Sequence, residues 1–152
     1  MKKLRYITLA LSAAFSIAMA NTCHAAAVKK CTDEEWLQAD AQLHKLDNWA
    51  AVENYYTQYK QCDDGYLAEG SADSISYLMA EKWQSLSELN TLIKRKGPKF
   101  EQFTLGHISE ITGQERLQKL QMLSSRSCPK SLKPLCSKIN KAATNANNSY
   151  YR

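Results

Sequence analysis

Four carboxylates gather in one short stretch of the sequence, QCDDGYLAEGSADS at residues 61–74: Asp63, Asp64, Glu69 and Asp73. Side chains of this type can hold a metal ion, act as an acid/base pair, or line the solvated face of a helix. A calcium loop is not indicated, because the pattern D-x-D-x-D-G is absent. Nothing in the pattern buries Glu69 and Asp73 as an acid/base pair requires. The helical interpretation explains more, since Asp63 or Asp64 can cap a helix that carries the other two.

The helix predicted after this cap carries a polar stripe opposite its apolar line, made of Glu69, Asp73, Tyr77 and Glu81. This stripe is either a solvated face or an acidic, tyrosine-bearing contact surface for a partner. Tyrosine suits an interface because its ring gives rigid contact area and its hydroxyl gives a polar tip. The candidate partner-binding residues are therefore Asp64, Glu69, Asp73, Tyr77 and Glu81.

Other catalytic patterns are absent from the sequence. It contains no G-x-S-x-G, no H-E-x-x-H, no phosphate-binding glycine loop and no C-x-x-C. His44 and His107 lie far apart along the chain and are interpreted as surface or packing residues. We therefore predict no catalytic residue, no cofactor and no metal, so the chain is not expected to be an enzyme.

The N-terminus has the pattern of a secretory signal peptide. A positive segment with Lys2, Lys3 and Arg5 precedes an apolar, alanine-rich stretch over 6–20. A transmembrane helix would need about 20 apolar residues, so no transmembrane segment is expected. Cleavage fits after Ala20 or after Ala25. The later site gives a signal peptide over 1–25 and a protein exported to the periplasm.

The cysteines favour the later cleavage site and predict two disulfides. Five cysteines occur in the chain, and removal of residues 1–25 leaves an even number. Two helices over 32–45 and 48–62 would form an antiparallel hairpin whose open ends meet at Cys31 and Cys62. That geometry predicts the Cys31–Cys62 bond. Elimination then pairs Cys128 with Cys136, which requires a turn before a helix that starts near Pro134.

The rest of the pattern is helical and predicts a compact all-α domain over 26–142, built from six or seven short helices. The third helix is expected from about residue 64 to 83, and Gly97-Pro98 ends the fourth. The polar, low-complexity tail over 143–152 is expected to be disordered. The predicted helix caps are Asp47 and three capping boxes, Thr32–Glu35, Ser85–Glu88 and Thr112–Glu115.

Charge is distributed unevenly along the chain. Residues 26–93 contain 5 basic and 12 acidic residues, whereas residues 94–152 contain 12 basic and 3 acidic ones. The two halves can face each other or a charged partner. The basic segment 94–99 is either a helix C-terminus with favourably placed cations or a contact for an anionic partner. Nucleic acid is not expected, because no aromatic residues are interleaved in this segment.

Three runs carry a resemblance: CDDGYLAEGSADSISYLMAEKW, LNTLIKRKGPKFEQFTLGHI and CPKSLKPLCSKI. Over about residues 45–140 the chain resembles small exported proteobacterial proteins of unknown function. It is also similar, in class, size and compartment, to periplasmic immunity proteins that neutralise type VI cell-wall amidases. The resemblance transfers no catalytic motif to this sequence.

Together these features predict a periplasmic, non-enzymatic binding protein. Its most concrete form is an immunity or inhibitor protein directed at a secreted toxin or cell-wall hydrolase. Two alternatives stay open: an envelope structural or stress protein, and a cell-wall hydrolase that uses the acidic cluster. A protein partner is expected, and a homodimer stays open.

Overall fold

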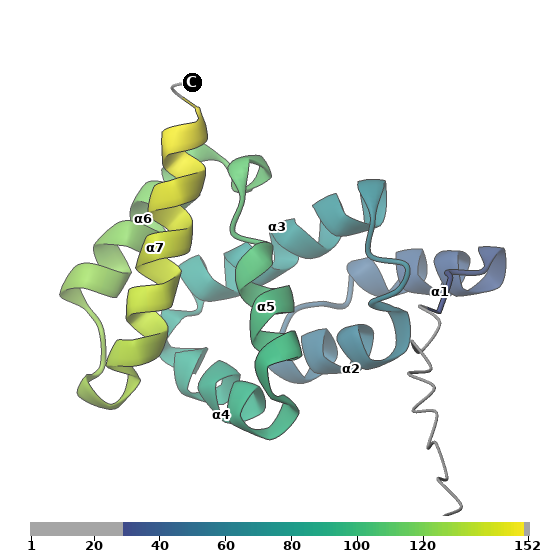
Figure 1. Cartoon of the computed structure of the whole chain (residues 1–152), viewed down its shortest axis with the longest axis horizontal. Helices are drawn as coiled ribbons and strands as arrows, with labels where there is room; N and C mark the ends of the chain where they lie inside the picture. Colours follow the sequence, from purple (N-terminus) through teal and green to yellow (C-terminus); the bar gives the residue numbers. More distant parts are fainter. Residues whose placement is uncertain (1–28, 151–152) are drawn as a thin grey trace, which may run out of the picture.

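A computed structural model describes residues 29–150 and shows an all-α chain, which confirms the predicted fold class (Figure 1). Seven α-helices and three short 3-10 turns make up this range, and it contains no strand. The predicted signal peptide, 1–25, lies outside the described residues. The helices are α1 (Asp33–Leu43), α2 (Trp49–Tyr59), α3 (Gly65–Glu81), α4 (Leu86–Lys96), α5 (Pro98–Gly106), α6 (Gln114–Arg126) and α7 (Lys133–Ser149).

Two helical hairpins lie at opposite ends of the long axis of the molecule (Figure 1). α1 and α2 form one end, α6 and α7 form the other, and α3 runs between them. The core side of α3 includes Ala72, Ile75, Leu78 and Met79, all almost completely buried. α3 therefore connects the two ends through one continuous hydrophobic core.

The first hairpin is closed by the predicted Cys31–Cys62 disulfide, whose Cα atoms lie 4.8 Å apart. Cys31 precedes α1 and Cys62 follows α2, so the bond joins the two open ends of the hairpin. The second predicted disulfide, Cys128–Cys136, is also present, with a Cα–Cα distance of 6.1 Å. A turn after Cys128 brings the two together, and α7 begins at Lys133 with Pro134 in its first turn.

Of the predicted caps, the capping box Thr32–Glu35 is confirmed. The Thr32 side chain accepts a hydrogen bond from the Glu35 amide, and the Glu35 carboxylate accepts one from the Thr32 amide. The prediction of Asp47 as the cap of α2 is wrong by one residue. The N-cap is Asn48, whose side-chain oxygen accepts from the Ala51 amide at 2.9 Å.

The other two predicted capping boxes are wrong because 3-10 turns precede those helices. Ser85 has φ −82° and ψ 3°, not the extended conformation that a capping serine needs. Its hydroxyl instead accepts from the Trp49 indole at 2.8 Å and donates to the Lys82 carbonyl. Thr112 belongs to the turn Glu110–Thr112, and Gly113, with φ 84°, occupies the N-cap of α6.

The disordered tail predicted from residue 143 is also wrong as far as Ser149, because α7 continues to that residue. Ala143 and Ala146 are buried and extend the apolar line of Ile139 along the helix. Composition is polar in this segment, but two small residues at helical spacing let α7 pack closely against the rest of the domain. Residues 151–152 lie outside the described range.

The two disulfides should contribute unequally to stability, because they close loops of different length. The cysteines are 31 residues apart in Cys31–Cys62 and 8 apart in Cys128–Cys136. Loop-closure entropy in the unfolded chain then predicts a loss of about 4 kcal/mol for the double variant Cys31→Ala/Cys62→Ala and about 2.5 kcal/mol for Cys128→Ala/Cys136→Ala. Urea unfolding of both variants measures this. An equal loss, or a larger one for the second pair, would contradict the entropic account.

Candidate functional site

The four carboxylates of residues 61–74 do not converge in the folded protein. The Asp63 side chain turns inward and is 9% exposed, and Asp64 caps α3 through a 2.8 Å bond from the Gly65 amide. Asp73 pairs with Arg116 of α6, and Glu69 is exposed. The stretch therefore does not assemble into one carboxylate site.

Side chains of α6 contact part of the predicted partner-binding stripe. Arg116 Nη1 lies 2.7 Å from Asp73 Oδ1 and 2.9 Å from Ser76 Oγ, and its guanidinium lies 5.9 Å from the centre of the Tyr77 ring. Lys119 forms an ion pair with Glu81. The basic half of the chain therefore compensates the acidic half at this contact. Both Asp73 and Glu81 remain exposed to solvent beside their partners.

Asp64, Glu69 and Tyr77 are also exposed, and the two carboxylates form no ion pair within residues 29–150. The structure brings further aromatic rings to the same region. Trp36 of α1 is 40% exposed and Tyr66 of α3 is 58% exposed, with 6.4 Å between their ring centres. We call the surface formed by Trp36, Tyr66, Glu69, Asp73 and Tyr77 the α1–α3 face.

A groove of about 350 Å³ lies on this face between α1 and α3. Tyr66 and Tyr77 line it, together with Asp73 and with Leu43 and His44 from the end of α1. A second hollow, of about 400 Å³, is lined by Trp36, Asp64 and Tyr66 beside the Cys31–Cys62 bond. Because Tyr66 lines both hollows, they form one uneven surface along the two helices.

Close approach of the two helices depends on Gly70. A Cβ atom at this position would lie 2.6 Å from Leu43 Cδ1, so any larger residue would push the Leu43 side chain aside. Tyr66, Gly70, Asp73 and Tyr77 recur at three- and four-residue steps and therefore share one side of α3. This spacing is the sequence signal that could have identified Tyr66.

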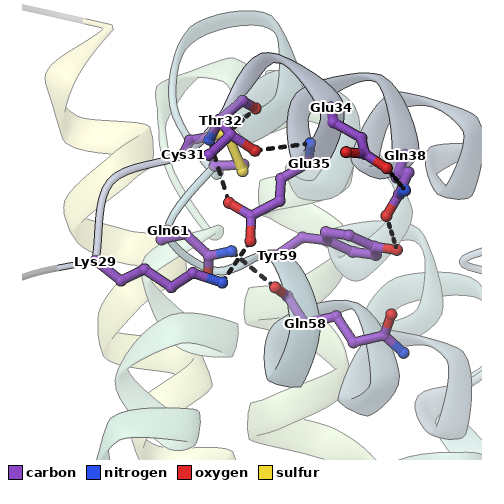
Figure 2. A network of polar contacts seen from close by, with 10 residues as sticks. Lys29, Cys31, Thr32, Glu34, Glu35, Gln38, Gln58, Tyr59 and Gln61 are labelled. Carbon is purple, nitrogen blue, oxygen red and sulfur yellow. Dashed lines mark hydrogen bonds and ion pairs between the residues drawn. A yellow bond between two sulfur atoms is a disulfide. The ribbon is translucent and has the colours of Figure 1, made fainter.

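A polar network fixes the start of α1, where Trp36 follows Glu35 in the sequence; Figure 2 shows the network. The Glu35 carboxylate accepts hydrogen bonds from the Lys29 ammonium and the Thr32 amide, and these bonds hold the pKa of Glu35 below its usual value. At the next turn, Gln38 accepts a 3.4 Å bond from the Tyr59 hydroxyl of α2. The bond between Tyr59 and Gln38 ties α2 to α1.

Beneath the surface, Asp63, Ser71 and His107 form a buried cluster that the sequence did not predict. His107 Nε2 lies 2.9 Å from Asp63 Oδ2 and 2.9 Å from Ser71 Oγ, and Ser71 donates to Asp63 Oδ1 at 2.7 Å. His107 Nδ1 lies 2.6 Å from the Phe103 carbonyl oxygen. The cluster joins the turn before α3 to the end of α5.

These three residue types occur in serine hydrolases, but the arrangement differs. In a catalytic triad the acid binds one imidazole nitrogen and the serine the other. Here Asp63 and Ser71 both meet Nε2, and Ser71 has no exposed surface. This geometry suits a buried ion pair that holds the fold together.

The ionisation of the cluster follows from its contacts. Burial by itself lowers the pKa of His107, but the hydrogen bond and charge of Asp63 and the bond to Phe103 outweigh it, so the pKa is raised. Burial and the Asp63 charge also raise the pKa of Tyr55. The contact with Asp63 therefore favours the protonated form of His107.

Within the described residues, one group of side chains that could bind a metal ion comes together. It consists of Cys31, Glu35 and Cys62, whose potential ligand atoms lie within 4.8 Å of one another. The two sulfurs are joined in the disulfide, so neither is a thiolate that could bind a metal. The group thus belongs to the disulfide that closes the first hairpin.

Comparisons with protein-family models, with curated proteins and with solved structures find no match. No helix within residues 29–150 is long and apolar enough to cross a membrane. The α1–α3 face is therefore defined as a candidate site by its own geometry.

Stability should depend on pH through the Asp63–His107 pair. A raised pKa in the folded protein means that the pair stabilises the fold fully below the unfolded histidine pKa of about 6.5, and less as the pH rises through the folded value. We expect the free energy of unfolding, measured in urea, to fall above about pH 6.5. In His107→Gln this fall should be absent.

His44→Gln is the matched control, because His44 is exposed and forms no ion pair within residues 29–150. This variant should keep the fall in stability. An equal pH slope in His107→Gln and the unmodified protein would contradict the pairing.

Proposed function

We propose that this chain is a periplasmic, non-enzymatic binding protein, most concretely an immunity or inhibitor protein that neutralises a secreted toxin or cell-wall hydrolase. One observation carries the proposal. On the α1–α3 face, the exposed rings of Trp36, Tyr66 and Tyr77 border hollows between two helices, beside carboxylates that have no ion pair in the described range.

This composition is typical of a protein interface. Tryptophan and tyrosine are enriched among the residues that contribute most to binding energy, and a polar rim around them supports orientation. The rings also lie on helices held by a disulfide and by the network at Glu35, so little order would be lost on binding. Asp64 and Glu69 add negative charge that favours a partner with a basic contact surface.

The two disulfides support export, since such bonds form and persist outside the reducing cytoplasm. The inhibitor class rests on the resemblance to periplasmic immunity proteins. The inward position of Asp63 and the burial of Ser71 favour a binding role over the hydrolase alternative, because neither group is presented to a substrate.

Reconstitution with a captured partner tests the proposal. The protein is used to capture partners from the periplasm, and each purified partner is assayed for peptidoglycan hydrolysis with and without the protein. We expect inhibition at equimolar amounts. A partner that keeps full activity, or hydrolysis by the protein itself, would overturn the proposal.

Variants then place the contact on the α1–α3 face. We expect Tyr66→Ala and Glu69→Lys each to weaken inhibition by about tenfold or more, because they remove a ring anchor or reverse a rim charge. Glu69 is a better test than Asp73, whose reversal would also break the pair with Arg116. Glu88→Lys is the matched control, since Glu88 is an exposed acid on α4 without an ion pair in the described range. Equal inhibition by Glu69→Lys and Glu88→Lys would exclude this face.

A further inference from the structure

The C-terminal quarter of the chain has an unusual charge composition. Residues 116–152 contain eight basic residues and no acidic residue. Three of the basic residues pair with carboxylates from other helices: Arg116 with Asp73, Lys119 with Glu81, and Lys138 with Glu101. These three face the rest of the domain and are compensated by it.

The other cations of this segment that the structure describes, on α6, α7 and the turn between them, are arranged differently. Arg126, Lys130, Lys133 and Lys141 form no ion pair within residues 29–150. Three of them, Arg126, Lys133 and Lys141, line one groove of about 560 Å³ between α6 and α7. No carboxylate lines this groove in the described part of the chain. We call it the α6–α7 groove.

The walls of the groove are held in place by covalent and polar contacts. The Cys128–Cys136 disulfide joins the end of α6 to the first turns of α7. Farther along, Asn140 Nδ2 of α7 donates to Ser124 Oγ at 2.9 Å and to Ser125 Oγ at 3.0 Å. The cations thus extend from a preorganised frame, which lowers the entropy lost when a ligand binds.

Electrostatics makes this groove favourable for an anion. Like charges that share a groove repel one another, and an anion placed between them removes that repulsion. Lys133 also begins α7, where the positive end of the helix dipole adds to the field. Guanidinium and ammonium groups are donors that bind phosphate oxygens in proteins. The exposed hydroxyl of Ser137 lies in the same groove and can add a further donor.

We propose that the α6–α7 groove is a binding site for a phosphate-bearing anion with at least two negative charges. The site lies at the opposite end of the molecule from the first hairpin (Figure 1) and shares no residue with the α1–α3 face. It is therefore independent of the proposed inhibitor function. The phosphate can belong to a soluble oligophosphate or to a phospholipid headgroup, since the groove chemistry is the same for both.

Two binding measurements on the purified, disulfide-bonded protein distinguish these sources. Sodium pyrophosphate is titrated in a calorimeter at low ionic strength, and vesicles of phosphatidylglycerol in phosphatidylcholine are compared with pure phosphatidylcholine vesicles by sedimentation. Binding to pyrophosphate supports a soluble ligand. Binding to anionic vesicles without pyrophosphate binding supports a lipid headgroup.

Charge-matched variants test whether the groove itself is responsible. We expect Lys133→Gln/Lys141→Gln to weaken binding by about tenfold or more. The control Lys30→Gln/Lys45→Gln removes the same charge from exposed lysines on either side of α1 that have no ion pair in the described range, and it should keep the affinity. Equal losses of affinity in both variants would show that binding depends on net charge alone, which would overturn the proposed site. A dissociation constant weaker than about 1 mM for both probes would also overturn it.

Discussion

The rest of the structure depends on the contacts made by the turn between α2 and α3. Its three residues each join it to a different part of the fold. Cys62 bonds to Cys31 before α1, Asp63 forms the buried pair with His107 after α5, and Asp64 caps α3. A carboxylate buried to this degree requires a charged or hydrogen-bonding partner. The Asp63–His107 pair therefore brings the end of α5 against the start of α3.

The distribution of charge follows from the same arrangement. α3 carries most of the acidic stripe, and α6 lies beside it with Arg116 and Lys119. Where the two helices meet, opposite charges compensate each other. Elsewhere some charges have no ion pair in the described range: Glu69 on the α1–α3 face, and Arg126, Lys133 and Lys141 in the α6–α7 groove. Intramolecular ion pairs thus compensate only part of the charge on these helices.

Much of the fold could be predicted because it depends on local periodicity. Helical spacing identified the helices, and the meeting ends of the first hairpin identified the Cys31–Cys62 bond. The predictions are wrong where a neighbouring turn changes the local conformation, as at Ser85 and Thr112. They are also wrong in α7, where the composition is polar but the alanines have helical spacing. Both kinds of error concern features that depend on contact with a neighbouring element.

The sequence by itself determined the all-α class, both disulfides and the exposed stripe of α3, because each follows from spacing along one or two helices. Only the tertiary structure decided which charges are compensated. Asp63 and His107 are 44 positions apart, as the numbering shows, and Arg116 reaches Asp73 from another helix. Coulomb energies depend on distance in space and on burial, neither of which is visible in a sequence. In the tertiary structure the apparent cluster of carboxylates therefore separates: Asp63 joins a buried ion pair, Asp64 caps α3, and Glu69 and Asp73 lie on an exposed face.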